Sequence, residues 1–185
     1  MRERPAVPRM LPIAPDDLTP EATELLAGMS TKDAIPNLYL TLVNYEGLMR
    51  RWLPFGAKVL NGKIPLRDRE LLILRTGWNC QARYEWAQHA VIAQRIGLSE
   101  DEIQRVKQGS DAGWDDFEAA LIRSADELHF DACVSDATWS TLASRYDKRQ
   151  LIELLMLVGE YHLVAYAANS LGIALDEDVA DTLNI

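Results

Sequence analysis

Apolar side chains recur along most of this chain at intervals of three and four residues, the spacing that places them on one face of an α-helix. No stretch alternates apolar and polar residues as a half-buried strand would. The pattern therefore predicts an all-α fold of roughly seven to nine helices. The expected helices start near Pro20 and then cover residues 37–51, 54–60, 65–78, 82–96, 100–109, 115–129, 136–146 and 148–171.

Capping residues and helix breakers set the expected boundaries. Thr19 and Asp147 each precede a helical run and carry a side chain that can accept a hydrogen bond from a first-turn amide. Ser99 is followed three residues later by Glu102, which is the spacing of a capping box. Because Pro54 lacks an amide hydrogen, we expect the chain to bend there and start a separate short helix.

Length and charge narrow the possible partners. A chain of 185 residues is long enough for one domain with a sizeable core, and we expect residues 1–185 to form a single domain with residues 1–19 as a proline-rich N-terminal extension. The net charge of −9 argues against nucleic acid and against an anionic membrane surface, because both require a basic patch. A small molecule or another copy of the chain is the expected partner.

The cysteines and the apolar runs indicate a cytoplasmic protein. Cys80 and Cys133 are the only cysteines and lie far apart in sequence. We therefore interpret them as reduced thiols and not as a disulfide framework. The N-terminus has no apolar segment of the kind that a secretory signal contains. The most apolar run, residues 151–168, is interrupted by two glutamates and a histidine, so we expect no membrane span.

The last long helix, over residues 148–171, is apolar on nearly every side. Its apolar residues cannot all face one core, so the helix is central in the bundle or also packs against a neighbouring subunit. This pattern predicts a homo-oligomer.

An acid and an imidazole interrupt the apolar stripe of the helix expected over residues 82–96. At about 3.6 residues per turn, Glu85 and His89 lie one turn apart, and Trp86 shares their face. Gln88 belongs to the polar side, which points elsewhere. Glu85 and His89 are therefore not part of a solvated face, and we expect them at an interior site.

A second acid, Glu70, lies between apolar residues of the preceding helix, which we expect to fold back against the first as an αα-hairpin. Burial would raise the pKa of either carboxylate and a neighbouring imidazolium would lower it, so the cluster could supply one acid and one base. The simpler alternative for Glu70 is a salt bridge to Arg67, Arg69 or Arg75.

The other histidines and a metal site are weaker candidates. His129 and His162 each interrupt an apolar face, as hydrogen-bonded core histidines do. A cation at position 129 would also complement the C-terminal end of its helix. Glu85 and His89 could supply two metal ligands, but no further histidine or cysteine repeats near them, so we expect no metal.

Cys80 is a possible nucleophile with a geometric objection. It precedes His89 by nine residues, which places it half a turn away around the helix. No C-x-x-C pair exists, because position 83 is Arg83. A thiol near a helix N-terminus can nevertheless have a lowered pKa.

Several runs of this sequence resemble the carboxymuconolactone decarboxylase family, which also contains the alkylhydroperoxidase D group. They are residues 65–75 (PLRDRELLILR), 84–89 (YEWAQH) and 97–99 (GLS), and downstream residues 125–129 (ADELH) and 134–139 (VSDATW). The resemblance covers about residues 39–175. It implies an all-α, alkylhydroperoxidase D-like helical bundle that is oligomeric, commonly a trimer or hexamer.

The resemblance also separates two branches of the family. In the peroxidase branch a glutamate, a C-x-x-C pair and a histidine form a proton relay and thiol pair. Glu70 and His89 match the glutamate and the histidine, but the two cysteine positions fall on Ala82 and Glu85. The chain is therefore similar to the decarboxylase-type branch, which uses no cofactor and acts on carboxylated lactones from aromatic catabolism.

Together these features predict a cofactor-independent lyase, or a related acid–base enzyme, for a small carboxylated or lactone-like compound. We expect His89 to be the general acid or base, Glu85 to orient and tune it, and Glu70 to relay protons. The expected substrate-binding residues are Trp78, Trp86, His129 and Tyr161.

Two alternatives belong to other classes of protein. A thiol-dependent peroxidase would use Cys80 alone with an external thiol, and it requires a lowered pKa for that thiol. A non-enzymatic oligomer would bind a small molecule in the same pocket without turnover.

Overall fold

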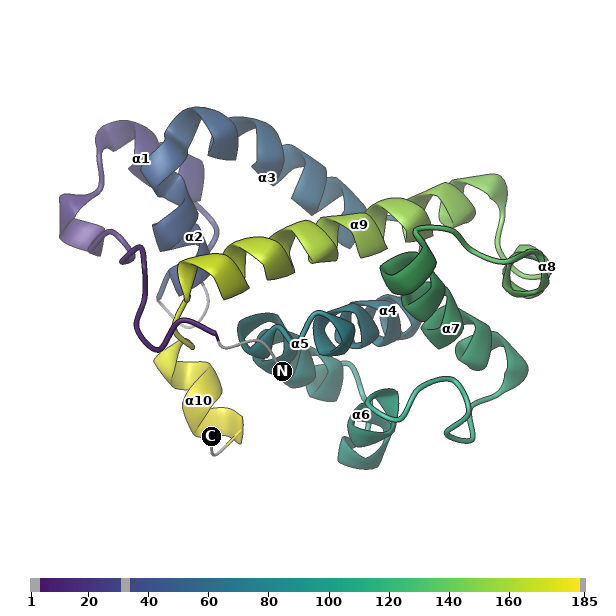
Figure 1. Ribbon diagram of the computed structural model, residues 1–185. Coiled ribbons are helices and arrows are strands. Elements are labelled where there is room, and N and C mark those ends of the chain that lie inside the picture. The colour runs from purple at the N-terminus through teal and green to yellow at the C-terminus, as the bar shows by residue number, and fades with distance from the viewer. Residues whose placement is uncertain (1–3, 31–33, 184–185) are drawn as a thin grey trace.

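The computed structural model describes residues 4–30 and 34–183, and this part of the chain is all-α, as predicted (Figure 1). Its elements are η1 (Pro15–Asp17), α1 (Pro20–Leu26), α2 (Asn37–Leu42), η2 (Val43–Tyr45), α3 (Glu46–Leu60), α4 (Leu66–Asn79), α5 (Arg83–Arg95), α6 (Glu100–Val106), α7 (Asp116–Asp131), α8 (Asp136–Ala143), α9 (Lys148–Leu171) and α10 (Glu177–Leu183).

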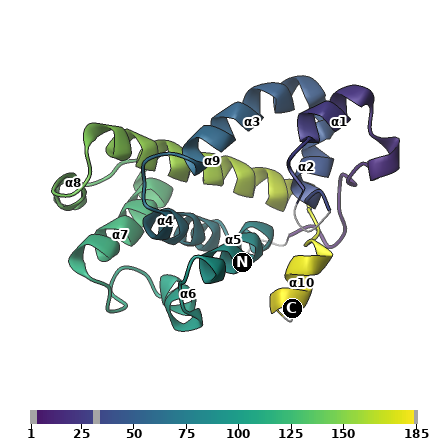
Figure 2. The same ribbon diagram turned by 180° about the vertical axis from the view of Figure 1, so that it is seen from behind.

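Helix α9 is the central element of the bundle. In Figures 1 and 2 it runs between α1–α3 on one side and α4–α7 on the other. Its most apolar 18 residues have a mean hydropathy of 1.4, which is high enough for a membrane span, but half of them are buried inside the fold. Leu154 and Leu157 pack there against Leu72 of α4 and Leu121 of α7. Helix α9 is thus the core helix of the bundle.

Most helices begin where the capping residues predict. The side chain of Thr19 accepts a hydrogen bond from the amide of Ala22, and Ser99 and Asp147 each form a complete capping box. The side chain of Ser135 accepts a hydrogen bond from a first-turn amide of α8. These boundaries depend on neighbouring residues alone, which is why the sequence predicts them.

The expected break at Pro54 is wrong. Helix α3 continues through Pro54, and the bend comes earlier, at η2. Met49 and Val59, on either side of the proline, are both buried. Packing of both halves against the bundle favours a continuous helix despite the missing amide donor, because tertiary burial commonly outweighs local propensity.

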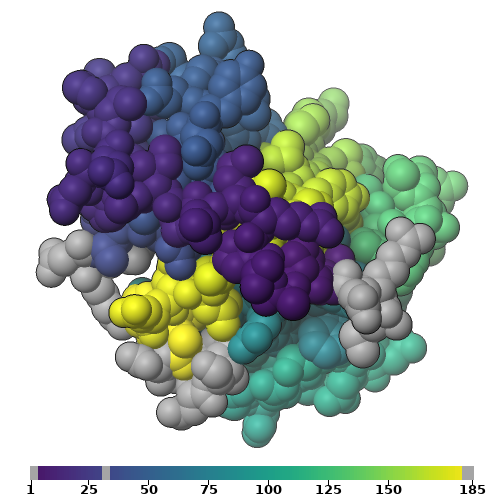
Figure 3. Space-filling view, turned by 60° about the vertical axis from the view of Figure 1, so that its left-hand side comes forward, coloured from purple at the N-terminus to yellow at the C-terminus, as the bar shows by residue number. Residues whose placement is uncertain are grey.

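Helix α10 is absent from the predicted set, whereas α1 and α6, which are equally short, are predicted from their capping residues. The residues before it join the N-terminal segment at the end of α9. Figure 3 shows the N-terminal residues lying against the C-terminal residues. The amide of Arg9 donates to the carbonyl of Leu171 over 2.7 Å, and the Arg4 guanidinium donates to the carbonyl of Cys80 over 2.8 Å.

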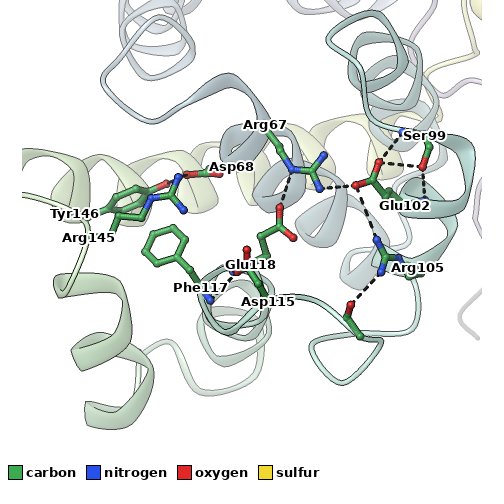
Figure 4. Close-up of polar contacts among 11 residues, drawn as sticks. Arg67, Asp68, Ser99, Glu102, Arg105, Asp115, Phe117, Glu118, Arg145 and Tyr146 are labelled. Atoms are coloured by element: carbon green, nitrogen blue, oxygen red, sulfur yellow. Dashed lines mark hydrogen bonds and ion pairs between the residues drawn. The ribbon is translucent and has the colours of Figure 1, made fainter.

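A polar network fixes the start of α4 (Figure 4). The Arg67 guanidinium donates to Glu102 of α6 over 2.5 Å and to Glu118 of α7 over 2.7 Å. The Tyr146 hydroxyl donates to the buried Asp68 carboxylate over 2.7 Å. These contacts join α4 to α6, α7 and the segment before α9, and so they fix the helix that carries Glu70.

Candidate active site

Helices α4 and α5 form the predicted hairpin and bring its polar residues together. At Gly77 of α4, a Cβ would lie 3.0 Å from Oε1 of Glu85. A glycine at this point leaves room for the Glu85 carboxyl between the two helices. Glu70, Glu85 and His89 are all buried, with exposed fractions of 0%, 2% and 8%.

A cavity of about 470 Å³ lies beside this hairpin. Its walls come mainly from α3, α5 and α9, with contributions from α2, from Arg69 of α4 and from the loop at residues 28–30. Most of its lining is apolar or aromatic. The polar side chains that line it include Arg69, Glu85, His89 and Glu160. Such a concave, largely apolar space with a few polar groups is typical of a small-molecule site.

Glu70 holds the His89 ring in place. Nδ1 of His89 lies 2.7 Å from Oε2 of Glu70, while the other Glu70 oxygen accepts a hydrogen bond from Nε of Arg69 over 2.8 Å. Burial acts to raise the pKa of Glu70, but His89 and Arg69 together bring that pKa below its ordinary value. Glu70 is therefore an ionised carboxylate that fixes the orientation of the imidazole, and no described residue bonds Nε2 of the ring.

Glu85 has the opposite electrostatic environment. Both of its carboxyl oxygens are buried and have no hydrogen-bond partner among the described residues. Burial, followed by the negative charge of Glu160, raises the pKa of Glu85 well above its ordinary value. The site thus contains one acid that is kept ionised and another that is kept neutral. Such a division is typical of acid–base active sites.

Glu160 and Tyr161 enter the cavity from α9. Nε1 of Trp52 donates to Oε1 of Glu160 over 2.5 Å, and burial raises the pKa of Glu160 despite this bond. The ring of Tyr161 packs edge-on against His89 with centroids 4.9 Å apart. Of the four residues expected to bind substrate, Tyr161 is the one that lines this cavity.

Three expected roles do not agree with this geometry. Glu85 was expected to orient His89, but the hydrogen bond to the ring comes from Glu70. Trp86 follows Glu85 by about 100° around α5, so it packs toward α6, with its ring 5.5 Å from that of Trp78. Neither tryptophan lines the cavity, whereas Gln88, expected on a polar face elsewhere, does.

Cys80 and His129 lie at another place in the fold. Neither lines the cavity, and Nδ1 of His129 is 3.8 Å from Sγ of Cys80. Burial of the Cys80 side chain raises its pKa to about 12. The lowered pKa that a thiol-dependent mechanism requires is therefore not what this environment produces.

Sequence reasoning did not find the contribution of α2 and α3. Trp52 and Tyr39 line the cavity from segments that carry no charged motif. The spacing of Trp52 in α3 shows that it is on a helix, but only the tertiary structure shows that its indole reaches Glu160. The sequence indicates Arg69 only as an ion-pair partner of Glu70, and the structure places it on the cavity wall as well.

The sequence matches the profile of the carboxymuconolactone decarboxylase family over residues 46–126. This segment contains α3 to α6 and most of α7, and with them Glu70, Glu85 and His89. No curated protein matches the sequence significantly.

Solved structures with the same fold cover nearly the whole chain. A peroxidase-related protein from Silicibacter sp. TM1040 is 12% identical, with a TM-score of 0.80 and 97% of each chain covered. A peroxidase-related protein with an alkylhydroperoxidase AhpD core, from Ralstonia eutropha JMP134, is 18% identical, with a TM-score of 0.74, 89% of this chain and 88% of its own covered. A cysteine-to-alanine variant of the debrominase Bmp8, in complex with 2,3,4-tribromopyrrole, is 16% identical, with a TM-score of 0.72 and 98% of each chain covered. At these identities the similarity shows the AhpD-like fold.

Proposed function

Because the chain belongs to the carboxymuconolactone decarboxylase family, we propose that it is a cofactor-independent acid–base enzyme of the lyase type. Its substrate is a small carboxylated or lactone-like compound of the kind found in aromatic catabolism. The observation that carries this proposal is the hydrogen bond between the buried Glu70 carboxylate and Nδ1 of His89, whose ring lines the cavity.

The two acids and the histidine divide the proton transfers between them. Glu70 engages Nδ1 of His89, so Nε2 is the ring atom that can take a proton from a bound molecule and return it. Glu85 is kept neutral by its surroundings, and a neutral carboxyl can donate a proton. The roles therefore differ from the expected ones: Glu70 orients the histidine, and Glu85 is the second proton donor.

A decarboxylation can be written with these groups. The bond between the substrate carbon and its carboxylate breaks, carbon dioxide leaves, and the electron pair is delocalised into the adjacent lactone carbonyl. The carbon then takes a proton from Glu85 or from protonated His89, and that residue recovers its proton from water. Arg69 lies at the cavity wall and supplies a positive charge that attracts the carboxylate of the incoming substrate.

The cavity fits a substrate of one small ring. Its volume of about 470 Å³ lies in the range of roughly 300–1,000 Å³ that is usual for small-molecule sites. The Bmp8 variant was solved with 2,3,4-tribromopyrrole, so another protein of this fold is known with a small-ring compound. The aromatic rings of Tyr39, Trp52 and Tyr161 provide the apolar walls.

His89→Gln and Glu70→Gln test the proposal. Carbon dioxide release from a panel of carboxylated lactones should fall about 10²–10⁴-fold in His89→Gln, the usual effect of losing one positioned proton-transfer group. Glu70→Gln should also lower the rate, because the ring loses the carboxylate that fixes its orientation. Glu24→Gln, an exposed site on α1, is the matched control. Unchanged turnover in His89→Gln would refute the assignment.

The thiol-dependent peroxidase is the less favoured alternative. Several structures of this fold are peroxidase-related proteins, but Cys80 lies outside the cavity and burial raises its pKa. Loss of hydroperoxide reduction in Cys80→Ser would support this alternative. Tight ligand retention without turnover, with all three site residues intact, would instead support a non-catalytic binding protein.

We also propose that the protein is a homo-oligomer, a trimer or a hexamer, in the cytoplasm. Exposed apolar residues follow one face of α9 at helical spacing and could pack against another copy of the chain. They are Ile152, Met156, Leu163 and Tyr166. The two unpaired cysteines support the location, and a single domain over residues 1–185 stays a prediction.

A further inference from the structure

Three side chains that commonly bind metals meet on the side of α9 away from the cavity lining. Cys80 directly follows α4, His129 lies in the last turn of α7, and His162 lies in the middle of α9. Nδ1 of His129 is 3.8 Å from Sγ of Cys80 and 3.0 Å from Nε2 of His162. The three potential ligand atoms all lie within 4.8 Å of one another. We call these three residues the Cys80 cluster.

Two of the three distances within the Cys80 cluster are close to those around a tetrahedral zinc ion. With Zn–S bonds of about 2.3 Å and Zn–N bonds of about 2.05 Å, tetrahedral angles place sulfur and nitrogen about 3.6 Å apart and two nitrogens about 3.3 Å apart. The observed 3.8 Å and 3.0 Å each differ from these values by a few tenths of an ångström. The third pair, Sγ of Cys80 and Nε2 of His162, lies within 4.8 Å, so side-chain rotations that bring these two atoms closer would place all three on one ion.

The surroundings of the cluster also prepare it for an ion. Nδ1 of His162 lies 2.8 Å from the carbonyl of Val158, so the proton of the neutral ring belongs on Nδ1 and the lone pair of Nε2 faces the cluster. A backbone carbonyl in this position is a common outer partner of metal-binding histidines. The carbonyl of Cys80 accepts hydrogen bonds from Arg4 and Asn169, which hold the turn that carries the thiol.

Charge and access are compatible with a divalent cation. Asp126 lies one turn before His129 and adds a negative charge near the ring, against the positive charge of Arg75. Asp126 is itself held by Arg75 and Asn79. Both histidines are half-buried, so an ion can enter from solvent. A hydrogen bond between two histidines does not require a cysteine beside them, and a buried cysteine does not require two histidines. Binding of a metal ion explains why all three side chains lie together.

We propose that the Cys80 cluster binds one Zn²⁺ ion through Sγ of Cys80, Nδ1 of His129 and Nε2 of His162. Binding releases the thiol proton of Cys80 to solvent and requires the His129 tautomer with its proton on Nε2. Three protein ligands leave the fourth position for a water molecule. The ion links α4, α7 and α9.

This proposal replaces the expectation of no metal, which rested on the neighbours of Glu85 and His89 in sequence. The ligands of the cluster are separated by 49 and 33 positions, so no local spacing indicates them. None of them lines the cavity, and the zinc proposal does not depend on the proposed lyase activity.

Metal titration of the full chain without a histidine tag tests the proposal. After removal of metals with a chelator, Co²⁺ is added as a spectroscopic substitute for Zn²⁺, and Zn²⁺ affinity is measured by competition. We expect one ion per chain, with a thiolate-to-cobalt charge-transfer band in the near ultraviolet. Cys80→Ser should abolish the band. It should also weaken Zn²⁺ binding by more than roughly 10–100-fold, which is the usual effect of losing a group that only hydrogen-bonds to a metal ligand.

Matched variants separate the cluster from the other thiol and imidazole of the chain. Cys133→Ser, at an exposed cysteine, and His89→Gln should keep the band and the Zn²⁺ affinity. His162→Gln should weaken binding as Cys80→Ser does, and it takes the place of Cys80→Ser if that variant does not fold. Absence of the charge-transfer band at saturating Co²⁺, or equal Zn²⁺ affinity in wild type and His162→Gln, would overturn the proposal whatever the lyase assay shows.

Discussion

The unfolding free energy of Glu85→Gln relative to the wild type should increase with pH. Glu85 is buried without a hydrogen-bond partner among the described residues, and burial together with Glu160 raises its pKa in the folded protein. Above its ordinary pKa of 4.5, the carboxyl of the unfolded chain ionises while the folded one stays protonated. The folded state then binds more protons, so the stability of the wild type falls as the pH rises. Glutamine cannot titrate and does not share this loss.

The size of the effect follows from proton linkage. Between the unfolded and the folded pKa of Glu85, the difference in unfolding free energy between variant and wild type should increase by about 1.4 kcal/mol per pH unit. For a chain of this length that corresponds to roughly 3–6 °C in melting temperature per pH unit. Below the unfolded pKa both carboxyls are protonated, and the difference should be constant. Any fixed cost of burying the amide shifts the whole curve and leaves its slope unchanged.

Thermal and urea unfolding of both proteins from pH 4 to pH 8 measure this slope. Glu24→Gln, at an exposed position on α1, is the control and should show no comparable trend. A plateau at higher pH would mark the folded pKa of Glu85. Two results would show that Glu85 is ionised in the folded protein and would refute its role as a neutral proton donor. One is a difference in unfolding free energy that stays constant across the pH range. The other is a wild type that becomes more stable relative to Glu85→Gln as the pH rises.

Three further substitutions test contacts around the site and its scaffold. Tyr146→Phe removes the hydroxyl that donates to buried Asp68 and should lower the unfolding free energy by about 1–3 kcal/mol in urea titrations; no change would mean that water replaces the donor. Asp147→Ala deletes the capping box of α9 and should cost about 1 kcal/mol, whereas Asp147→Asn should keep most of the stability. Trp52→Phe removes the donor to Glu160 and should raise the pKa of that carboxyl further, as measured by NMR titration; a lowered pKa would contradict the contact.

The sequence predicts features that depend on near neighbours. The caps at Ser99 and Asp147 involve atoms within three residues, and the turn between α4 and α5 brings Glu70 to His89 across a short separation. Pro54 shows the limit of this reasoning, since burial on both sides of it keeps α3 continuous.

Features that join distant segments could not be predicted in this way. Trp52 meets Glu160 across 108 positions, and only packing of α3 on α9 shows it. Trp86 carries the same apolar signal as its neighbours on α5, and its direction is set by the contact with α6. A pattern of apolar residues shows which face of a helix is buried but not which partner that face meets.

The most direct test of the account is carbon dioxide release from carboxylated lactones by the wild type, His89→Gln and Glu70→Gln, with Cys133→Ser as the thiol control. The account predicts turnover in the wild type and in Cys133→Ser, and its loss in His89→Gln without a change in melting temperature large enough to indicate unfolding. Turnover that survives in folded His89→Gln would contradict the assignment of His89 and Glu70 as the acid–base pair.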